Sequence, residues 1–383
     1  MRSRKQGWTG LLKREGADFL AWAREERVLS NRLLLLATAL STQLRGSVLT
    51  PEEAHDVWEA VPAVLSRCNE QATYEMPGAA CAYAWLHMLE RYVRTWLALE
   101  RLVEKNCLPM GTNGVRALDV GTGPGPAAFA IHDFYVAMVG YSEVTGNPKW
   151  RQPPQVICVE SKRRPNHFRH QLAELLFQQA GREPKSVLSM ASTLGDFLEF
   201  EPTQERKQYL EVLRSEEDEY FDDLAGRWDS NRVYLPDEAN DMAQSLHRYR
   251  LVTFSNFLTT PGLVKSVEPN LVEVLHDAAP GTVVLVLGGS GDRYQKIYDC
   301  VDRMANPSGF ELTVEGDLVS CSDSELAGQV YEQGRLFYEI LQGLDHNEDE
   351  ATETVRRYFE RGAPIDFRSS QIRAYRKRRF SKT

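Results

Sequence analysis

Hydrophobic positions follow two different spacings along this 383-residue chain. Up to about residue 110, apolar side chains recur three and four positions apart, which is the period of helices that bury one face. From Val115 on, short apolar runs typical of buried parallel strands alternate with helical segments. The pattern therefore predicts a helical N-terminal region followed by a region of alternating strands and helices.

The N-terminal region carries clear helix signals. Thr50 offers a cap, Pro51 suits the first helical position, and Glu53 adds an acid to the first turn. A long amphipathic stretch covers 83–103, and the run 33–40 is too short to cross a bilayer, so we expect a buried helix there. We predict an all-helical domain over 1–110 that acts as a lid or substrate platform.

The second region predicts an α/β fold, with a doubly wound, mostly parallel sheet of seven strands. The expected strands cover 115–120, 155–159, 185–190, 250–255, 282–287, 311–314 and 371–375, with the last two as an antiparallel pair. A helix is expected over 292–305. Helix-biased insertions at about 201–249 and 323–363 complete this domain, which spans 111–383, and we expect them to form a wall over the ligand site.

One loop combines several chemical signals between the first strand and its helix. Asp119-Val-Gly121-Thr122-Gly123-Pro-Gly125-Pro126 places three glycines at alternate positions, so the turn can be tight and a flat ligand can approach the peptide groups. Pro126 suits the first helical turn, whose N-terminus favours a polar, partly anionic ligand. The alternative is a glycine-rich turn that binds nothing.

The spacing Asp-x-Gly-x-Gly-x-Gly differs from the Gly-x-Gly-x-x-Gly of dinucleotide sites. It resembles motif I of the class I S-adenosylmethionine (SAM) methyltransferases. This resemblance implies a Rossmann-like methyltransferase sheet and SAM as cofactor. It also implies that Asp119 anchors the loop and that Gly121, Thr122, Gly123 and Gly125 bind the cofactor.

A carboxylate follows the second predicted strand. Glu160 stands where a doubly wound sheet meets ribose hydroxyls, and a carboxylate can accept both of their hydrogen bonds. Its distance from the glycines exceeds the usual separation, and a Gly- and Pro-containing insertion over 141–154 accounts for the excess. The alternative is an ordinary exposed acid at a strand end.

Two further strand ends reach the same edge of the predicted sheet. After the third strand, Ser192, Thr193 or Asp196 could bind an adenine amino group, and after the fourth, Ser255 and Asn256 stand at the methyl-transfer position. The segment 255–258 lacks the Asn/Asp-Pro-Pro-Tyr/Phe element of enzymes that methylate exocyclic amines. No catalytic residue is identified from the sequence.

Composition narrows the remaining possibilities. A formal charge of −9 argues against indiscriminate nucleic-acid binding. The six cysteines are scattered, so neither a metal site nor an iron–sulfur site is expected. No signal peptide or membrane span is recognisable, and we expect a cytoplasmic protein. The oligomeric state is not predicted.

A weaker resemblance concerns Tyr74-Glu-Met-Pro77, which precedes a long helix and the glycine loop. It is similar to the Tyr-x-Met-Pro element of the methyltransferase-like proteins associated with the small ribosomal subunit, although their cysteine cluster is missing here. That resemblance implies a substrate role for Tyr74 and an RNA or ribosomal partner. Arg376 and Arg378 in the basic C-terminal segment would then contact phosphates; the alternative is a terminal strand that frays into solvent.

The leading hypothesis is thus a SAM-dependent methyltransferase whose acceptor is RNA, a ribosomal particle or a small metabolite. A non-catalytic SAM-binding assembly factor is a second possibility. A nucleotide-dependent oxidoreductase is disfavoured by the glycine spacing.

Overall fold

The described residues of the N-terminal region form four helices in the computed structural model. They are α1 (Lys13–Glu25), α2 (Val28–Gly46), α3 (Pro51–Leu65) and α4 (Ala79–Glu104). The structure describes residues 13–65, 75–110, 115–146, 154–180, 187–190, 249–289, 292–318, 324–345, 353, 355 and 370–378. In this part of the chain, the expected helical character of residues up to 110 is confirmed.

The expected cap of α3 is present as a reciprocal pair of hydrogen bonds. The Glu53 amide donates to Thr50 Oγ1 at 3.2 Å, and the Thr50 amide donates to Glu53 Oε2 at 3.0 Å. Two amides that the helix itself leaves without acceptors are thereby satisfied.

A seven-stranded sheet follows, in the order β3-β2-β1-β4-β5-β7-β6. The strands are β1 (Arg116–Val120), β2 (Gln155–Val159), β3 (Val187–Met190), β4 (Leu251–Ser255), β5 (Val283–Gly289), β6 (Phe310–Leu318) and β7 (Ser370–Lys377). The first five are parallel, and β7 runs antiparallel to both β5 and β6. This arrangement confirms the predicted doubly wound fold and its antiparallel final pair.

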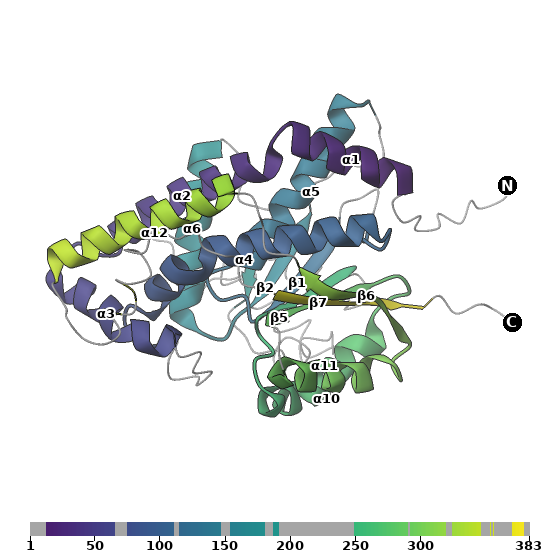
Figure 1. Ribbon diagram of the computed structural model, residues 1–383. Coiled ribbons are helices and arrows are strands. Elements are labelled where there is room, and N and C mark those ends of the chain that lie inside the picture. Colours follow the sequence, from purple (N-terminus) through teal and green to yellow (C-terminus); the bar gives the residue numbers. More distant parts are fainter. Residues whose placement is uncertain are drawn as a thin grey trace, which may run out of the picture.

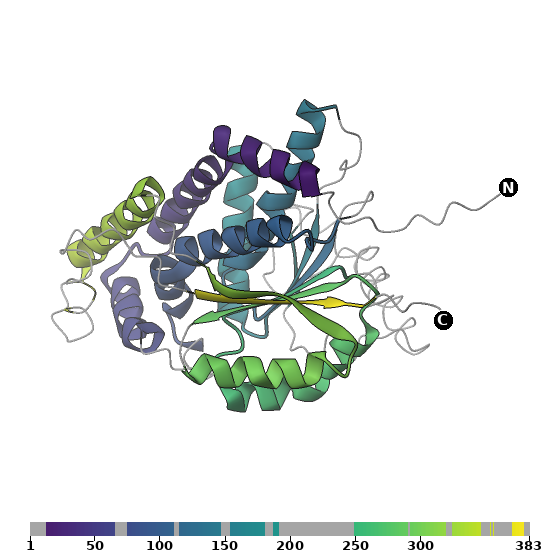
Figure 2. The same ribbon diagram turned by 45° about the vertical axis from the view of Figure 1, so that its right-hand side comes forward.

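Helices cover both faces of this sheet (Figures 1 and 2). Those after the first strands are α5 (Pro126–Val144), α6 (Arg163–Ala180), α10 (Pro261–Asp277) and α11 (Asp292–Ala305), and α12 (Ser324–Leu344) lies between β6 and β7. One buried cluster packs the helices from α1 through α6, together with α12, against one face of the sheet. A second cluster packs α10 and α11 against the other face of the sheet. In Figure 1 the second pair lies below the sheet.

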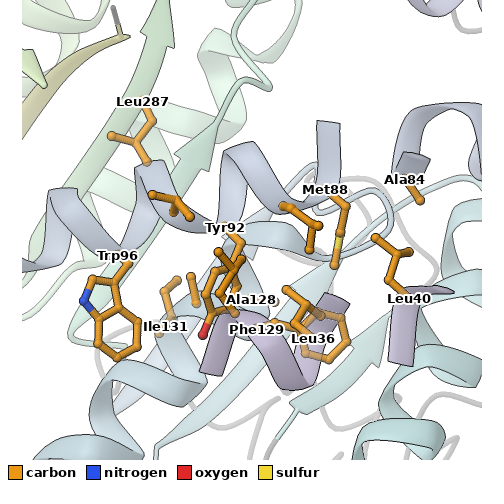
Figure 3. Packing of buried hydrophobic residues seen from close by; sticks show 14 of the residues in the cluster. Leu36, Leu40, Ala84, Met88, Tyr92, Trp96, Ala128, Phe129, Ile131 and Leu287 are labelled. Carbon is orange, nitrogen blue, oxygen red and sulfur yellow. The ribbon is translucent and has the colours of Figure 1, made fainter. Parts of the chain in front are cut away.

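The larger cluster packs α2, α4 and α5 closely together (Figure 3). Its aromatic centre includes Trp96 against Phe134, with ring centroids 5.0 Å apart in an edge-to-face arrangement. The N-terminal helices and the sheet therefore share one core, and a domain boundary at residue 110 stays a prediction.

Several predicted boundaries shift. Helix α5 continues to Val144, so the insertion predicted from residue 141 starts later, and β5 extends through Gly288 and Gly289. Gly288 and Gly289 continue β5 because they pair with Gln371 and Ser370 of β7. The insertion over 201–249 lies outside the described residues except for Tyr249. The second insertion includes α12, which packs against α2, α3 and α4.

Candidate functional site

The glycine loop lies at the carboxyl end of β1. Gly121, Gly123 and Gly125 have φ values of 68°, 57° and 97°, in the left-handed region that favours glycine. The amides of Gly121 and Thr122 both donate to the Val159 carbonyl oxygen, at 2.9 and 3.2 Å. The loop is therefore fixed to the end of β2 before Pro126 begins α5.

The three glycines have different surroundings. A Cβ on Gly121 would lie 2.1 Å from the Phe257 ring, and one on Gly125 would lie 2.7 Å from Cδ of Arg169. A Cβ on Gly123 would meet no heavy atom within 4 Å. Gly121 and Gly125 thus permit close packing within the protein, whereas Gly123 leaves space through which a ligand could approach the backbone.

Glu160 lies directly beside this open position. Its Oε2 accepts the Gly123 amide at 2.8 Å, and its Oε1 accepts the Lys162 amide at 2.9 Å. Each carboxylate oxygen retains a further lone pair, because an ionised carboxylate accepts about four hydrogen bonds. The structure brings Glu160 to the glycine loop, and its contact with a ribose stays a prediction.

Asp119 is 1% exposed, and neither of its carboxylate oxygens has a hydrogen-bond partner. The loop is anchored instead through its main chain, because the Thr122 hydroxyl donates to the Asp119 carbonyl oxygen at 2.7 Å. Burial raises the pKa of the Asp119 carboxyl to about 7, although the Thr122 hydroxyl and the Arg169 guanidinium oppose the rise.

A second orphaned acceptor lies next to Asp119 in the sheet. Thr253 on β4 is in register with Asp119, is fully buried, and has a hydroxyl oxygen without a partner. Unpaired buried polar atoms are rare in native proteins and call for a missing donor such as a ligand or water. No sequence pattern singles out Thr253, since threonine is common in strands.

Helix α6 contributes two residues that sequence reasoning missed. Asn166 Nδ2 donates to the Glu160 carbonyl oxygen at 3.0 Å, and Arg169 donates to the Gly123 carbonyl oxygen at 2.7 Å. Arg169 also hydrogen-bonds the Asn166 side chain. The available signal was their three-residue spacing, which places both on one face of a helix immediately after the strand-end carboxylate.

The end of β4 meets the same loop. Asn256 has a φ of 55°, its amide donates to the Leu287 carbonyl oxygen at 2.8 Å, and its Nδ2 donates to Ser255 Oγ at 3.4 Å. The next residue, Phe257, packs over Gly121. Ser255 and Asn256 therefore lie at the carboxyl edge with the loop, and their role at the methyl-transfer position stays a prediction.

Tyr74, Ser192, Thr193 and Asp196 lie outside the described residues. The segment that follows Tyr74 nevertheless reaches the site, because Glu75 forms an ion pair with Lys162, two residues beyond Glu160. Gly78, with a φ of 70°, packs so closely on α3 that a Cβ would lie 2.3 Å from the Asp56 carbonyl oxygen.

The basic C-terminal segment lies elsewhere. Arg376 is in register with Val283, the first residue of β5, whereas the glycine loop is at the opposite, carboxyl edge. The length of β5 separates these edges by roughly 20 Å. Arg378 pairs with Glu311 at 3.3 Å. The structure thus does not bring Arg376 and Arg378 to the glycine loop. Arg376 lies in β7 and Arg378 follows it, and β7 runs antiparallel to β5, so its C-terminal end lies at the amino edge of β5.

Lys377 in the same segment is 6% exposed and donates to the carbonyl oxygens of Leu275, His276 and Ser308, at 2.8, 3.1 and 2.6 Å. It closes the C-terminal end of α10. The expected alternative of a fraying strand is wrong for the described part of this segment, because β7 remains paired through Lys377.

Within the described ranges, no group of three or more His, Cys, Asp or Glu could hold a metal ion. No single described helix is long and apolar enough to span a membrane, although α2 and α3, bent by 118°, pass such a test as a pair.

No family model and no curated protein match this chain. Similar solved structures include phosphoethanolamine N-methyltransferase 2 from Haemonchus contortus with S-adenosyl-L-methionine, 12% identical over 83% of this chain and 60% of that chain, with a TM-score of 0.40. A SAM-dependent methyltransferase from Thiobacillus denitrificans with S-adenosyl-L-homocysteine is 14% identical over 77% and 96% of the chains, with a TM-score of 0.33. The cyclase SpnF is 14% identical over 75% and 80%, with a TM-score of 0.37.

These similar structures include members of the class that the glycine motif resembles. The fold assignment rests on the sheet order, and the site rests on the contacts of the glycine loop.

Proposed function

We propose that this protein is an enzyme that binds SAM at the glycine loop and transfers its methyl group to an acceptor. The observation that carries the proposal is Gly123, which faces open space while its amide is held by the carboxylate at the end of β2. In a doubly wound sheet, nucleotide ligands lie at this carboxyl edge.

The residues present fit this cofactor. Glu160 has free lone pairs for ribose hydroxyls, and the orphaned oxygens of Asp119 and Thr253 suit the protonated amino group of the methionine portion. We assign Ser255 and Asn256 to the wall near the sulfonium, and Ser192, Thr193 or Asp196 to the adenine. When bound, SAM supplies an electrophilic methyl group.

The chain's own part in the reaction is positioning. Phe257 covers Gly121, and the helical layer excludes water from the face of the sheet that carries Asp119. Orientation and desolvation can supply much of a methyl transfer when the acceptor is already nucleophilic. The proposal therefore requires no general base.

Calorimetric titration tests the cofactor. SAM and S-adenosyl-L-homocysteine should bind with micromolar affinity, whereas NADH and NADPH, added at the same concentrations, should not. Binding of the dinucleotides without SAM would contradict the proposal and favour an oxidoreductase.

For the acceptor, we infer a small molecule rather than RNA or a ribosomal particle. Arg376 and Arg378 lie at the edge away from the loop, and Lys377 is occupied by carbonyl oxygens. The net charge of −9 would also repel a polyanion.

Transfer of a radiolabelled methyl group should be measured in parallel on small-molecule extract, total RNA, ribosomal subunits and protein. Label should enter the small-molecule fraction. Label in RNA that is lost in an Arg376→Ala/Arg378→Ala variant would instead support the RNA hypothesis, and SAM binding without labelling of any fraction would favour the non-catalytic factor.

A further inference from the structure

Arg169 is among the largest fully buried side chains of the described residues, at 1% exposure. An arginine is almost never buried to this extent unless its charge is compensated, because removing a guanidinium from water is costly. Its position beneath the glycine loop therefore calls for a physical reason.

The contacts of Arg169 are directed at the loop. Its guanidinium donates to the carbonyl oxygen of Gly123, whose amide donates to Glu160. Both main-chain polar groups of Gly123 are thus held by side chains, one from α6 and one from the end of β2. Through Asn166, Arg169 is also linked to the main chain of Glu160.

The stem of Arg169 fills the space that Gly125 leaves. A Cβ on Gly125 would lie 2.7 Å from Cδ and 3.0 Å from Cγ of Arg169. The third glycine of the motif is therefore matched to this arginine, in addition to having a φ of 97°.

The positive charge of Arg169 also acts on the Asp119 carboxyl. Among the described residues, the charged groups that act on the Asp119 carboxyl are Arg169, which lowers its pKa, and Glu160, which raises it. The neutral groups around Asp119 are the Thr122 hydroxyl, the Cys158 thiol and the Thr253 hydroxyl. Burial raises the pKa of Cys158 to about 12, so this thiol stays neutral.

We propose that Arg169 is the positioning residue of the cofactor loop, which holds Gly123 open toward the ligand and balances the negative charge of Asp119 and Glu160. The inference rests on the proposed function. It also specifies the ligand: the balanced Asp119 should select adenosyl compounds that carry a protonated amino group.

Two variants and two probes test this role. S-adenosyl-L-homocysteine carries the amino group, whereas 5′-methylthioadenosine lacks the whole amino-acid end. Arg169→Met keeps much of the stem without the charge, and Arg169→Lys keeps the charge without the planar fork. Arg303→Met, which removes an exposed arginine from α11, is the matched control.

At pH 7, Arg169→Met should weaken binding of S-adenosyl-L-homocysteine at least about tenfold and binding of 5′-methylthioadenosine by less, and Arg303→Met should change neither. Affinity of the wild type for the homocysteine compound should rise with pH as Asp119 ionises. In Arg169→Met this rise should move to higher pH, because the balancing charge is gone. Arg169→Lys should keep the wild-type pH profile but bind less tightly.

Equal losses for both probes with an unshifted pH profile would mean that Arg169 only supports the fold, and would overturn the inference. If circular dichroism shows that Arg169→Met does not fold, Arg169→Lys becomes the test. Wild-type affinity for S-adenosyl-L-homocysteine in Arg169→Lys would then overturn the inference. A wild-type protein that binds neither probe would overturn the proposed function itself.

Discussion

Two regions of this sheet differ in whether their buried polar side chains have hydrogen-bond or ion-pair partners. Around β6 and β7, Arg373 pairs with Asp302 and Glu315, its guanidinium lies 4.9 Å from the centre of the Tyr298 ring, and Lys377 donates to three carbonyl oxygens. Around the glycine loop, Asp119 and Thr253 are equally buried, but their side-chain oxygens have no donors.

The difference indicates what each region is for. A buried charge that its own chain satisfies stabilises a particular fold, because breaking the arrangement leaves an unpaired group. Buried acceptors without donors destabilise a protein, and they become favourable only when a ligand or a water molecule donates a hydrogen bond to them. The contacts of the β6–β7 region are thus structural, and the unpaired oxygens beside the glycine loop support the ligand site that we propose there.

The largest expected effect is on ligand affinity, when the same substitution is made at one glycine of each region. Gly123 and Gly281 both have positive φ, at 57° and 87°, and a Cβ on either would meet nothing within 4 Å. Gly123→Val should weaken S-adenosyl-L-homocysteine binding at least about a hundredfold, because the valine fills the approach to the loop. Gly281→Val should leave affinity unchanged while costing a similar stability, about 1–3 kcal/mol.

Calorimetry and thermal melts measure both quantities. Unchanged affinity in a folded Gly123→Val protein would remove the loop as the ligand site. A large affinity loss in Gly281→Val would show that the two regions are not independent.

In the structural region, Lys377→Met should lower the free energy of unfolding by about 3 kcal/mol, because three carbonyl oxygens lose their shared charged donor. Chemical denaturation measures this loss. Affinity for S-adenosyl-L-homocysteine should stay within twofold of the wild type, and a larger change would contradict the proposed division.

Glu160→Ala should weaken cofactor binding by about 2 kcal/mol, within the range for hydrogen bonds to a charged group. The matched control is Glu315→Ala, which removes an exposed carboxylate from the Arg373 pair. Titration with SAM should distinguish them. If Glu160→Ala changes the affinity for SAM less than twofold, Glu160 only accepts the hydrogen bond of the Gly123 amide and does not bind the cofactor.

The smallest effect concerns pH. The folded pKa of Asp119 is raised to about 7 from an ordinary value of 3.8, so the folded state binds the extra proton between these limits. Stability contributed by that proton is complete below about pH 4 and is lost as pH rises through 7. Asp119→Asn should therefore gain about 1 kcal/mol relative to the wild type between pH 6 and pH 7. Thermal melts without ligand measure this, and identical pH profiles would contradict the unpaired state of Asp119.

Most of the architecture could be predicted from the sequence because it depends on local periodicity. Apolar runs predicted all seven strands, and Thr50 with Glu53 predicted a cap that the structure contains. The glycine spacing likewise predicted a tight loop, since positive φ is a local requirement.

Other features depended on contacts between distant segments. Whether Arg376 faces a ligand is decided by the direction of β7, which places it at the amino edge of β5. The difference among the three loop glycines arises from Phe257 and Arg169, which lie far from them in sequence.

The sequence by itself thus determined the order of strands and helices, the left-handed loop and the carboxylate at its side, because these are properties of neighbouring residues. Only the tertiary structure decided that Lys377 and Arg373 are satisfied while Asp119 and Thr253 are not. The reason is that hydrogen-bond satisfaction depends on which groups meet across the sheet and its helices, and no local pattern contains that information.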